Sequence, residues 1–143
     1  MKKSQRLQRI ANLSHTAEQI AAQSFARASD EVTRYEAQIR ELERYRDEYL
    51  RQFERDHPGA LDGYRAQKLR DFVGRIEQAL AQLVDRHAQA ERRREHERTE
   101  WMGKRRRANT LTDVATRARG VEEVSFEKAL QREIDDRPRG PVR

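Results

Sequence analysis

The sequence has no cysteine, and it has only three prolines and six glycines in 143 residues. The lack of cysteine excludes a disulfide framework, a thiolate metal site and a cysteine nucleophile. No apolar run approaches the roughly 20 residues that a membrane-spanning helix needs. The start of the chain is basic but lacks the continuous apolar core of a secretory signal. We therefore expect a cytoplasmic protein.

Apolar residues are also scarce, with 35% hydrophobic against 39% charged residues. This composition is too polar to fill a compact core of several layers, which argues against a round globule. The common residues are Ala, Leu, Glu, Gln, Arg and Lys, all strong helix formers, while the helix breakers are few and clustered. The composition therefore favours long helices over a disordered chain.

Apolar residues recur three, four or seven positions apart in two segments, about 5–56 and about 64–134. This spacing is typical of a coiled-coil seam. In the first segment the seam contains Val32, Tyr35, Ile39, Leu42, Tyr49 and Phe53. In the second the same spacing continues even where the residues turn polar, which indicates one continuous helix with a poor seam in its middle. This seam contains Leu69, Val73, Ile76, Leu80, Leu83, His87, Ala90, Arg94, Glu97, Trp101, Lys104, Ala108, Leu111 and Ala115.

The stretch "DHPGALDG" interrupts the pattern with one proline and two glycines, which predicts a turn over about 57–63. We therefore predict an all-α fold, a long antiparallel two-helix coiled-coil hairpin. It forms a single coiled-coil domain over 1–143, with a disordered C-terminal tail over about 135–143. The second helix is the longer one, so its C-terminal part should extend past the first helix.

The position of the turn also predicts which residues face each other, because a short turn makes neighbouring helices antiparallel. Residue numbers of facing partners should sum to about 120. Ile39 then lies opposite Leu80, and Ala17 and Ala21 lie opposite Trp101. The three rings of Tyr45, Tyr49 and Phe53 lie opposite Leu69, Phe72, Val73 and Ile76, where aromatic area would hold the tip of the hairpin together.

Motifs for catalysis are absent: the sequence has no phosphate-binding loop, no dinucleotide fingerprint and no H-E-x-x-H. His87 and His96 are nine residues apart, on different faces of a helix, so an inert role is expected for both rather than metal binding. Carboxylate pairs such as Glu122 with Glu123 have nothing nearby to shift a pKa. We expect a protein that is not an enzyme, with no cofactor and no metal.

Residues 91–119 hold ten Lys/Arg and five Asp/Glu, which gives most of the net charge of +6. A basic stretch with a tryptophan is one possible signature of a nucleic-acid-binding coiled coil. However, the acidic residues are interleaved and the arginines fall on several helix faces, which favours a solvated, salt-bridged helix. We therefore expect no specific nucleic-acid binding.

Phe72 and Ile76 lie one helical turn apart, and two interpretations of them are open. They can pack in the core at the tip of the hairpin. Alternatively, Phe72 stands on the shoulder of the seam and the pair forms an exposed docking patch for another protein.

Several of these features resemble one family. The helix with "YRDEY" (Tyr45 to Tyr49), the glycine-containing turn, "KLRDFVGRIEQAL" and a single tryptophan some 25 residues further on are similar to the flagellar export protein FliJ. The resemblance in length and order of features covers nearly the whole chain.

The resemblance implies a stalk-like and chaperone-escort component of the flagellar type III export apparatus, at the cytoplasmic face of the inner membrane. Its implied partners are the hexameric export ATPase FliI, the export-gate protein FlhA and export chaperones. It implies gate binding through Phe72 and Ile76. The family's similarity to rotary stalks, which insert their terminal helices, implies that the end with the chain termini enters the ATPase ring. Because Arg117 and Arg119 lie near that end, we expect them to meet acidic loops of the ring. A stalk protein of a virulence-type secretion system has the same shape and is the alternative within this class.

Overall fold

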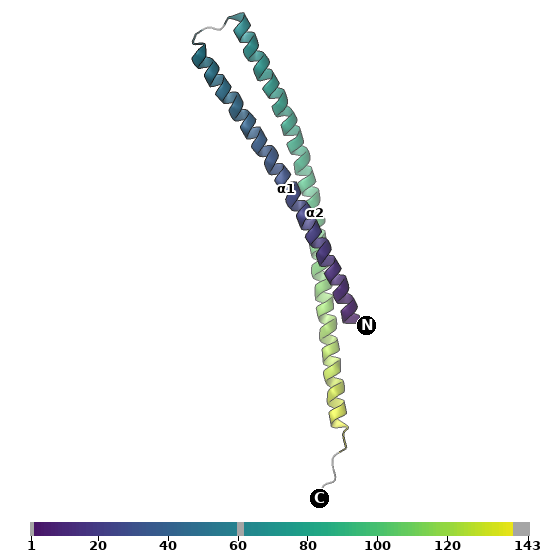
Figure 1. Cartoon of the computed structure of the whole chain (residues 1–143). Helices are drawn as coiled ribbons and strands as arrows, with labels where there is room; N and C mark the ends of the chain where they lie inside the picture. The colour runs from purple at the N-terminus through teal and green to yellow at the C-terminus, as the bar shows by residue number, and fades with distance from the viewer. Residues whose placement is uncertain (1, 60–61, 139–143) are drawn as a thin grey trace. The chain divides into compact units, whose positions relative to one another are not determined.

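The structure is a computed structural model that describes residues 2–59 and 62–138. It contains two α-helices, α1 (Lys3–Asp56) and α2 (Gly63–Asp135), and no strand in the described ranges (Figure 1). The boundaries expected from the sequence lie within two residues of these helix ends. Of the predicted disordered tail, residues 139–143 lie outside the described residues.

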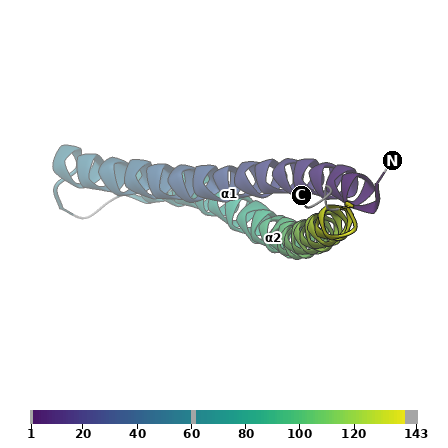
Figure 2. The ribbon, with the colours of Figure 1, turned by 90° about the horizontal axis from the view of Figure 1, so that it is seen from below.

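The two helices pack against each other, which confirms the predicted all-α helical hairpin. Each helix is one continuous ribbon in both views (Figures 1 and 2). No stretch of either helix, over the ranges that the structure describes, is long and apolar enough to cross a membrane.

The connection between the helices begins and ends with local signals. Gly59 has a φ of 102°, a left-handed conformation that glycine adopts without strain, so the chain can turn away from α1 there. Asp62 caps the start of α2, because its Oδ1 accepts a hydrogen bond of 2.8 Å from the backbone N–H of Arg65. These residues explain why the turn falls at the predicted place.

Contacts divide the chain into two compact units. Unit 1 consists of Met1–Ala22 with Glu100–Arg143, and unit 2 consists of Gln23–Thr99. Each unit therefore contains a part of α1 and a part of α2. The expectation of a single domain over 1–143 stays a prediction.

The buried residues of unit 1 are all small, whereas those of unit 2 include two larger aliphatic side chains. In unit 1 they are Ser4, Ala11, Ala108 and Ala115. In unit 2 they are Ala28, Val32, Ile76 and Ala90. Alanine and serine let two helices approach closely, so the packing of unit 1 in particular is narrow.

Most of the predicted seam on α2 faces the core, but Lys104 does not. Its side chain is exposed, while Trp101 and Ala108, one turn away on either side, are half-buried and buried. A long cationic side chain can leave the seam for water without disturbing the helix, which explains the difference from the predicted stripe.

Contacts across each unit confirm the predicted register. The residue numbers of five facing pairs sum to between 119 and 126, close to the predicted 120. The pairs are Ser4 with Glu122, Glu18 with Trp101, Glu31 with Arg93, Glu36 with His87 and Tyr49 with Phe72. The short turn therefore sets the pairing of the helices over both units.

Candidate partner-binding surfaces

An aromatic stack lies near the turn in unit 2 and consists of Tyr45, Tyr49 and Phe53 on α1 and Phe72 on α2. The rings of Tyr49 and Phe72 are stacked with centroids 3.7 Å apart, and the ring of Tyr45 is tilted against Phe72 at 5.9 Å. Phe72 is therefore held by two tyrosines of the other helix. Such ring pairs contribute beyond their buried area, so the stack stabilises the end of the hairpin.

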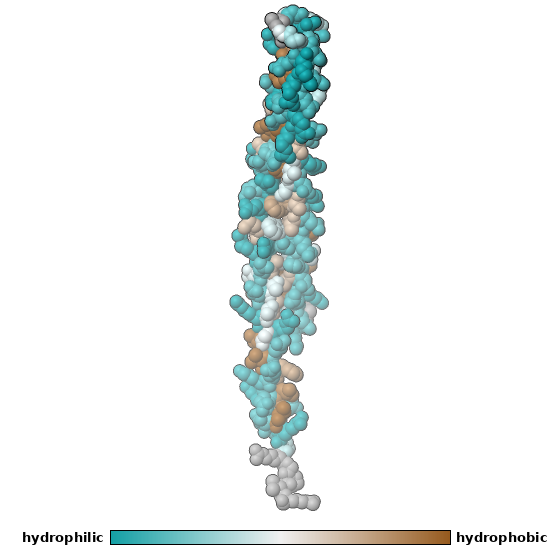
Figure 3. All heavy atoms as spheres, turned by 90° about the vertical axis from the view of Figure 1, so that its left-hand side faces the viewer, coloured by the Kyte–Doolittle hydropathy of each residue, from teal (hydrophilic) through white to brown (hydrophobic). Residues whose placement is uncertain are grey.

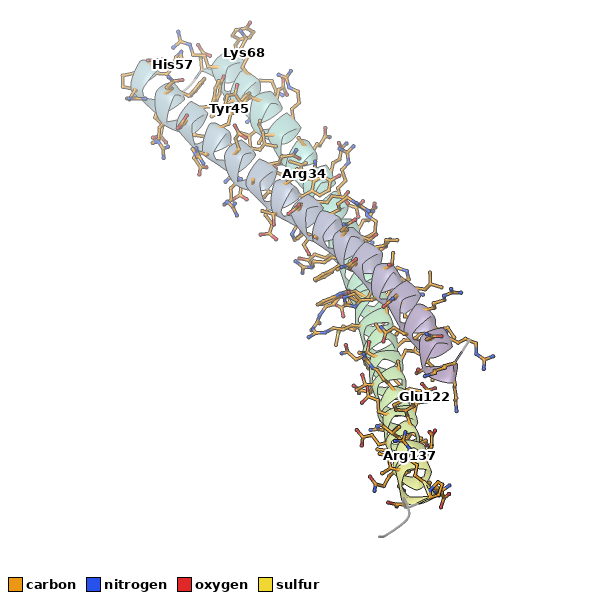
Figure 4. The ribbon with its side chains drawn as sticks, turned by 60° about the horizontal axis from the view of Figure 1, so that its bottom comes forward. Arg34, Tyr45, His57, Lys68, Glu122 and Arg137 are labelled. Atoms are coloured by element: carbon orange, nitrogen blue, oxygen red, sulfur yellow. The ribbon has the colours of Figure 1, made fainter. Side chains whose placement is uncertain are left out.

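The stack continues along α1 toward the turn. Phe53 lies 6.3 Å from the Tyr49 ring and 4.6 Å from the His57 ring, both in stacked geometry. His57 is labelled near the turn in Figure 4. The sequence predicted the three rings on α1, but not His57, whose ring extends the stack by one further turn.

Tyr64 and Lys68 form a second aromatic contact at the start of α2. The Lys68 Nζ lies 4.6 Å from the centre of the Tyr64 ring, a cation–π geometry. A side-chain hydrogen bond to Tyr64, and then the charge of its phenolate, raise the pKa of Lys68 above its usual 10.5. Lys68 therefore carries a full positive charge beside an exposed ring.

The structure places Phe72 and Ile76 differently from each other. Ile76 is buried, with 8% of its surface exposed, whereas Phe72 is half-buried between the tyrosines. Of the two interpretations left open by the sequence, the structure supports packing in the core. An exposed pair is not present in the folded hairpin, because Ile76 occupies the seam. Their role in gate binding stays a prediction.

At the other end of α1, unit 1 joins the helices through Ser4 and Glu122. The backbone N–H of Ser4 donates to Glu122 Oε1 at 3.1 Å, and its hydroxyl donates to Oε2. The side-chain bond first, and then the backbone bond, lower the pKa of Glu122 below its usual 4.5. The carboxylate thereby satisfies one of the free N–H groups at the start of α1. The expectation that nothing near Glu122 shifts its pKa is therefore wrong, because Ser4 of the other helix lies beside it.

Acidification is expected to loosen this contact. Because the pKa of Glu122 is lowered in the folded chain, its contribution to stability is present above pH 4.5 and is lost as the pH falls through the lower value. Protection of the first amides of α1 against hydrogen exchange, relative to an unstructured peptide at the same pH, should therefore fall as the pH drops through this lowered value, and Glu122→Gln should give low protection at every pH. Glu123→Gln, which changes an exposed neighbour, is the matched control. Equal exchange in both variants would contradict this role of Glu122.

Arg117 and Arg119 are both exposed on α2 in unit 1. Arg119 lines an open groove of about 550 Å³. The groove is also lined by Lys2, Ser4, Gln5, Glu122, Glu123, Phe126 and Glu127. The structure thus leaves both arginines accessible to a partner, and it brings one of them beside the start of α1.

A row of large apolar residues follows on α2, which we call the C-terminal apolar row. Each member is at least 47% exposed. The row consists of Phe126, Leu130 and Ile134, which share one face of α2, whereas Val121 and Val124 are exposed on the opposite face. Hydrophobic atoms are visible along the C-terminal part of α2 in Figure 3. The sequence interpretation predicted that α2 extends past α1 but missed this row as a surface.

Trp101 and two arginines of the basic stretch, Arg93 and Arg105, make contacts within the chain. The indole Nε1 donates a 2.7 Å hydrogen bond to Glu18, and the Arg105 guanidinium lies 5.6 Å from the ring centre. Arg93 pairs with Glu31 at 2.6 Å, across the helices of unit 2. These contacts favour the salt-bridged helix over a nucleic-acid-binding surface, because the ring, Arg93 and Arg105 already have protein partners.

Comparison with known protein families identifies the family to which the chain belongs. The family described as flagellar FliJ protein matches residues 2–137, which is nearly the whole chain. No curated protein and no solved structure matches the chain significantly. The match agrees with the features that suggested this family, namely the tyrosine pair, the turn and the Phe72 region. The chain therefore belongs to the FliJ family, whose members are non-catalytic components of the flagellar export apparatus.

Proposed function

We propose that this protein is the stalk-like and chaperone-escort component that connects the hexameric export ATPase FliI with the export gate FlhA. It works at the cytoplasmic face of the inner membrane and binds export chaperones there. The family match over residues 2–137 carries the proposal. The two units also differ chemically in a way that suits two partners, since one holds an aromatic stack and the other holds small core residues and exposed arginines.

The gate-binding surface in this proposal is the exposed part of the aromatic stack. Phe72 keeps a part of its ring accessible, and Tyr45 beside it is 54% exposed. Ile76 contributes by fixing the position of Phe72 from the core, one turn away on α2. Aromatic side chains held rigidly at a surface are typical hot spots of protein interfaces.

The ATPase-binding surface is unit 1. Its buried residues are alanines and a serine, so the two helices make a narrow element that suits a pore. Arg117 and Arg119 offer positive charge to acidic loops of a ring. The C-terminal apolar row adds a surface that would be covered in such a complex.

Phe72→Ala is expected to weaken binding to the cytoplasmic part of FlhA by about 30-fold, the loss typical of a hot spot of roughly 2 kcal/mol. The measurement is titration calorimetry, with helix content followed by circular dichroism. Tyr64→Ala removes a more exposed ring, 69% exposed, from the same end and should leave gate binding unchanged.

Phe72 also packs against Tyr49, so a second variant separates binding from folding. Phe72→Leu keeps most of the apolar volume and should preserve the helix content while still weakening gate binding. Full gate affinity in a folded Phe72→Leu protein and in Phe72→Ala would show that the ring only packs in the core.

A further inference from the structure

His87 of α2 lies between two carboxylates in unit 2, and each comes from a different helix. Its Nε2 is 3.3 Å from Oε1 of Glu36 on α1 and 3.3 Å from Oε1 of Glu91 on α2. The His87 side chain is 21% exposed, and the glutamates are 45% and 49% exposed. In the sequence of α1, Glu36 follows two positions after Arg34, which Figure 4 labels.

Hydrogen bonds alone cannot satisfy the three facing atoms of this group. A ring nitrogen carries at most one hydrogen, so Nε2 can donate one good hydrogen bond but faces two acceptor oxygens. In the other neutral tautomer Nε2 carries a lone pair, which faces two negative charges. One cation at the centre of the group would satisfy all three atoms at once.

The distances fit a metal ion. Zinc binds histidine nitrogen and carboxylate oxygen at about 2.0–2.2 Å, usually in a tetrahedron, which places neighbouring ligand atoms about 3.3–3.6 Å apart. The two measured separations of 3.3 Å match such edges. All three ligand atoms lie within 4.8 Å of one another. A small rotation of the half-exposed glutamates would therefore bring their two carboxylate oxygens to the same separation.

We propose that Glu36, His87 and Glu91 bind one divalent transition-metal ion, of which Zn²⁺ is the type case. The neutral imidazole and the two carboxylates carry a charge of −2 that the ion balances, and its fourth position is left for water. Because Glu36 belongs to α1 while the other two ligands belong to α2, the ion clamps the helices together within unit 2. The ligands meet only in the folded hairpin, so metal binding stabilises it.

Sequence reasoning weighed His87 only against His96 as a possible metal partner. His87 and Glu91 are separated by one helical turn, a spacing that is common on any charged helix. The third ligand, Glu36, lies 51 positions away and joins them only through the register of the hairpin. The proposed site therefore depends on the fold and not on a motif.

The test is titration calorimetry of the full chain with ZnCl₂ at pH 7.5, together with thermal unfolding followed by circular dichroism. We expect one ion per chain and an unfolding temperature that rises with zinc concentration. Loss of groups that only support a ligand costs about 10- to 100-fold in metal affinity, so His87→Gln and Glu36→Gln should each weaken binding at least about tenfold. His96→Gln changes an exposed histidine of the same helix and should bind as the unchanged chain does.

Glu36→Gln is the decisive variant, because it removes the only ligand from α1 and leaves the local pair on α2 intact. It should abolish the zinc-dependent rise in unfolding temperature. The proposal is overturned if the unchanged chain binds no zinc at millimolar concentration, if His87→Gln binds as tightly as the unchanged chain, or if Glu36→Gln keeps the zinc-dependent stabilisation.

Discussion

Replacing Val32 by aspartate is expected to separate α1 from α2 in unit 2. Val32 is 1% exposed and is the largest fully buried side chain among the described residues. A carboxylate at this position would be buried without a partner, which costs about 3 kcal/mol or more. Typical proteins have only about 5–15 kcal/mol of total stability, and the core of this unit is small. The loss should therefore be visible as unfolding under mild conditions.

The matched control is Val84→Asp, which makes the same chemical change on α2 of the same unit. Val84 is 54% exposed, so its free energy of unfolding should change by no more than about 0.5 kcal/mol. Urea unfolding followed by circular dichroism measures both variants. Equal losses of stability at the two positions would contradict the assignment of Val32 to the core.

The register of the two helices could be predicted from the sequence because it depends only on the position of the turn and on the helical repeat. A short turn with clear glycine and proline signals fixes which residues face each other, and helical periodicity carries that pairing along both helices. Tyr49 against Phe72 and Glu18 beside Trp101 are both close to the predicted pairing. Such pairs follow from counting residues and need no knowledge of side-chain conformations.

The burial of individual residues beside the seam could not be predicted in the same way. A straight helix drifts by about 20° per heptad relative to a 3.5-residue repeat, so a residue on the shoulder of the stripe can face inward or outward. This is why the spacing allows two interpretations of Phe72 and predicts Lys104 on the stripe, although its side chain is exposed. Rotamers of long side chains add a further freedom that the spacing does not specify.

The C-terminal apolar row shows another limit. Phe126, Leu130 and Ile134 follow one another at helical spacing, as seam residues do. Spacing alone does not tell whether a second helix is present to cover them. The structure answers this, because Ser4 at the start of α1 already pairs with Glu122. Beyond that pair few residues of α1 remain, and the row is exposed.

The proposed function predicts that a chain ending at Gly120 stimulates ATP hydrolysis by FliI far less than the full chain does but binds FlhA with the same affinity. The truncation removes Glu122, the partner of Ser4, and the whole C-terminal apolar row. Unit 1 would lose the apolar part of its proposed contact surface for the ring, while Arg117 and Arg119 remain. The aromatic stack of unit 2 contains none of the deleted residues, so gate binding through Phe72 should persist.

A full-length variant tests the two arginines separately, because the truncated chain keeps them. Charge reversal by Arg117→Glu together with Arg119→Glu should weaken association with the ring, more strongly at low salt than at high salt. Both side chains are exposed, so helix content should not change.

The most direct measurement is the ATP hydrolysis rate of purified FliI with the full chain and with the chain ending at Gly120, alongside calorimetric binding of both chains to the cytoplasmic part of FlhA. The proposed function predicts that the full chain raises the hydrolysis rate, that the truncated chain raises it far less, and that both bind FlhA equally. A truncated chain that stimulates hydrolysis fully but no longer binds FlhA would contradict the assignment of the ring to unit 1 and of the gate to the aromatic stack.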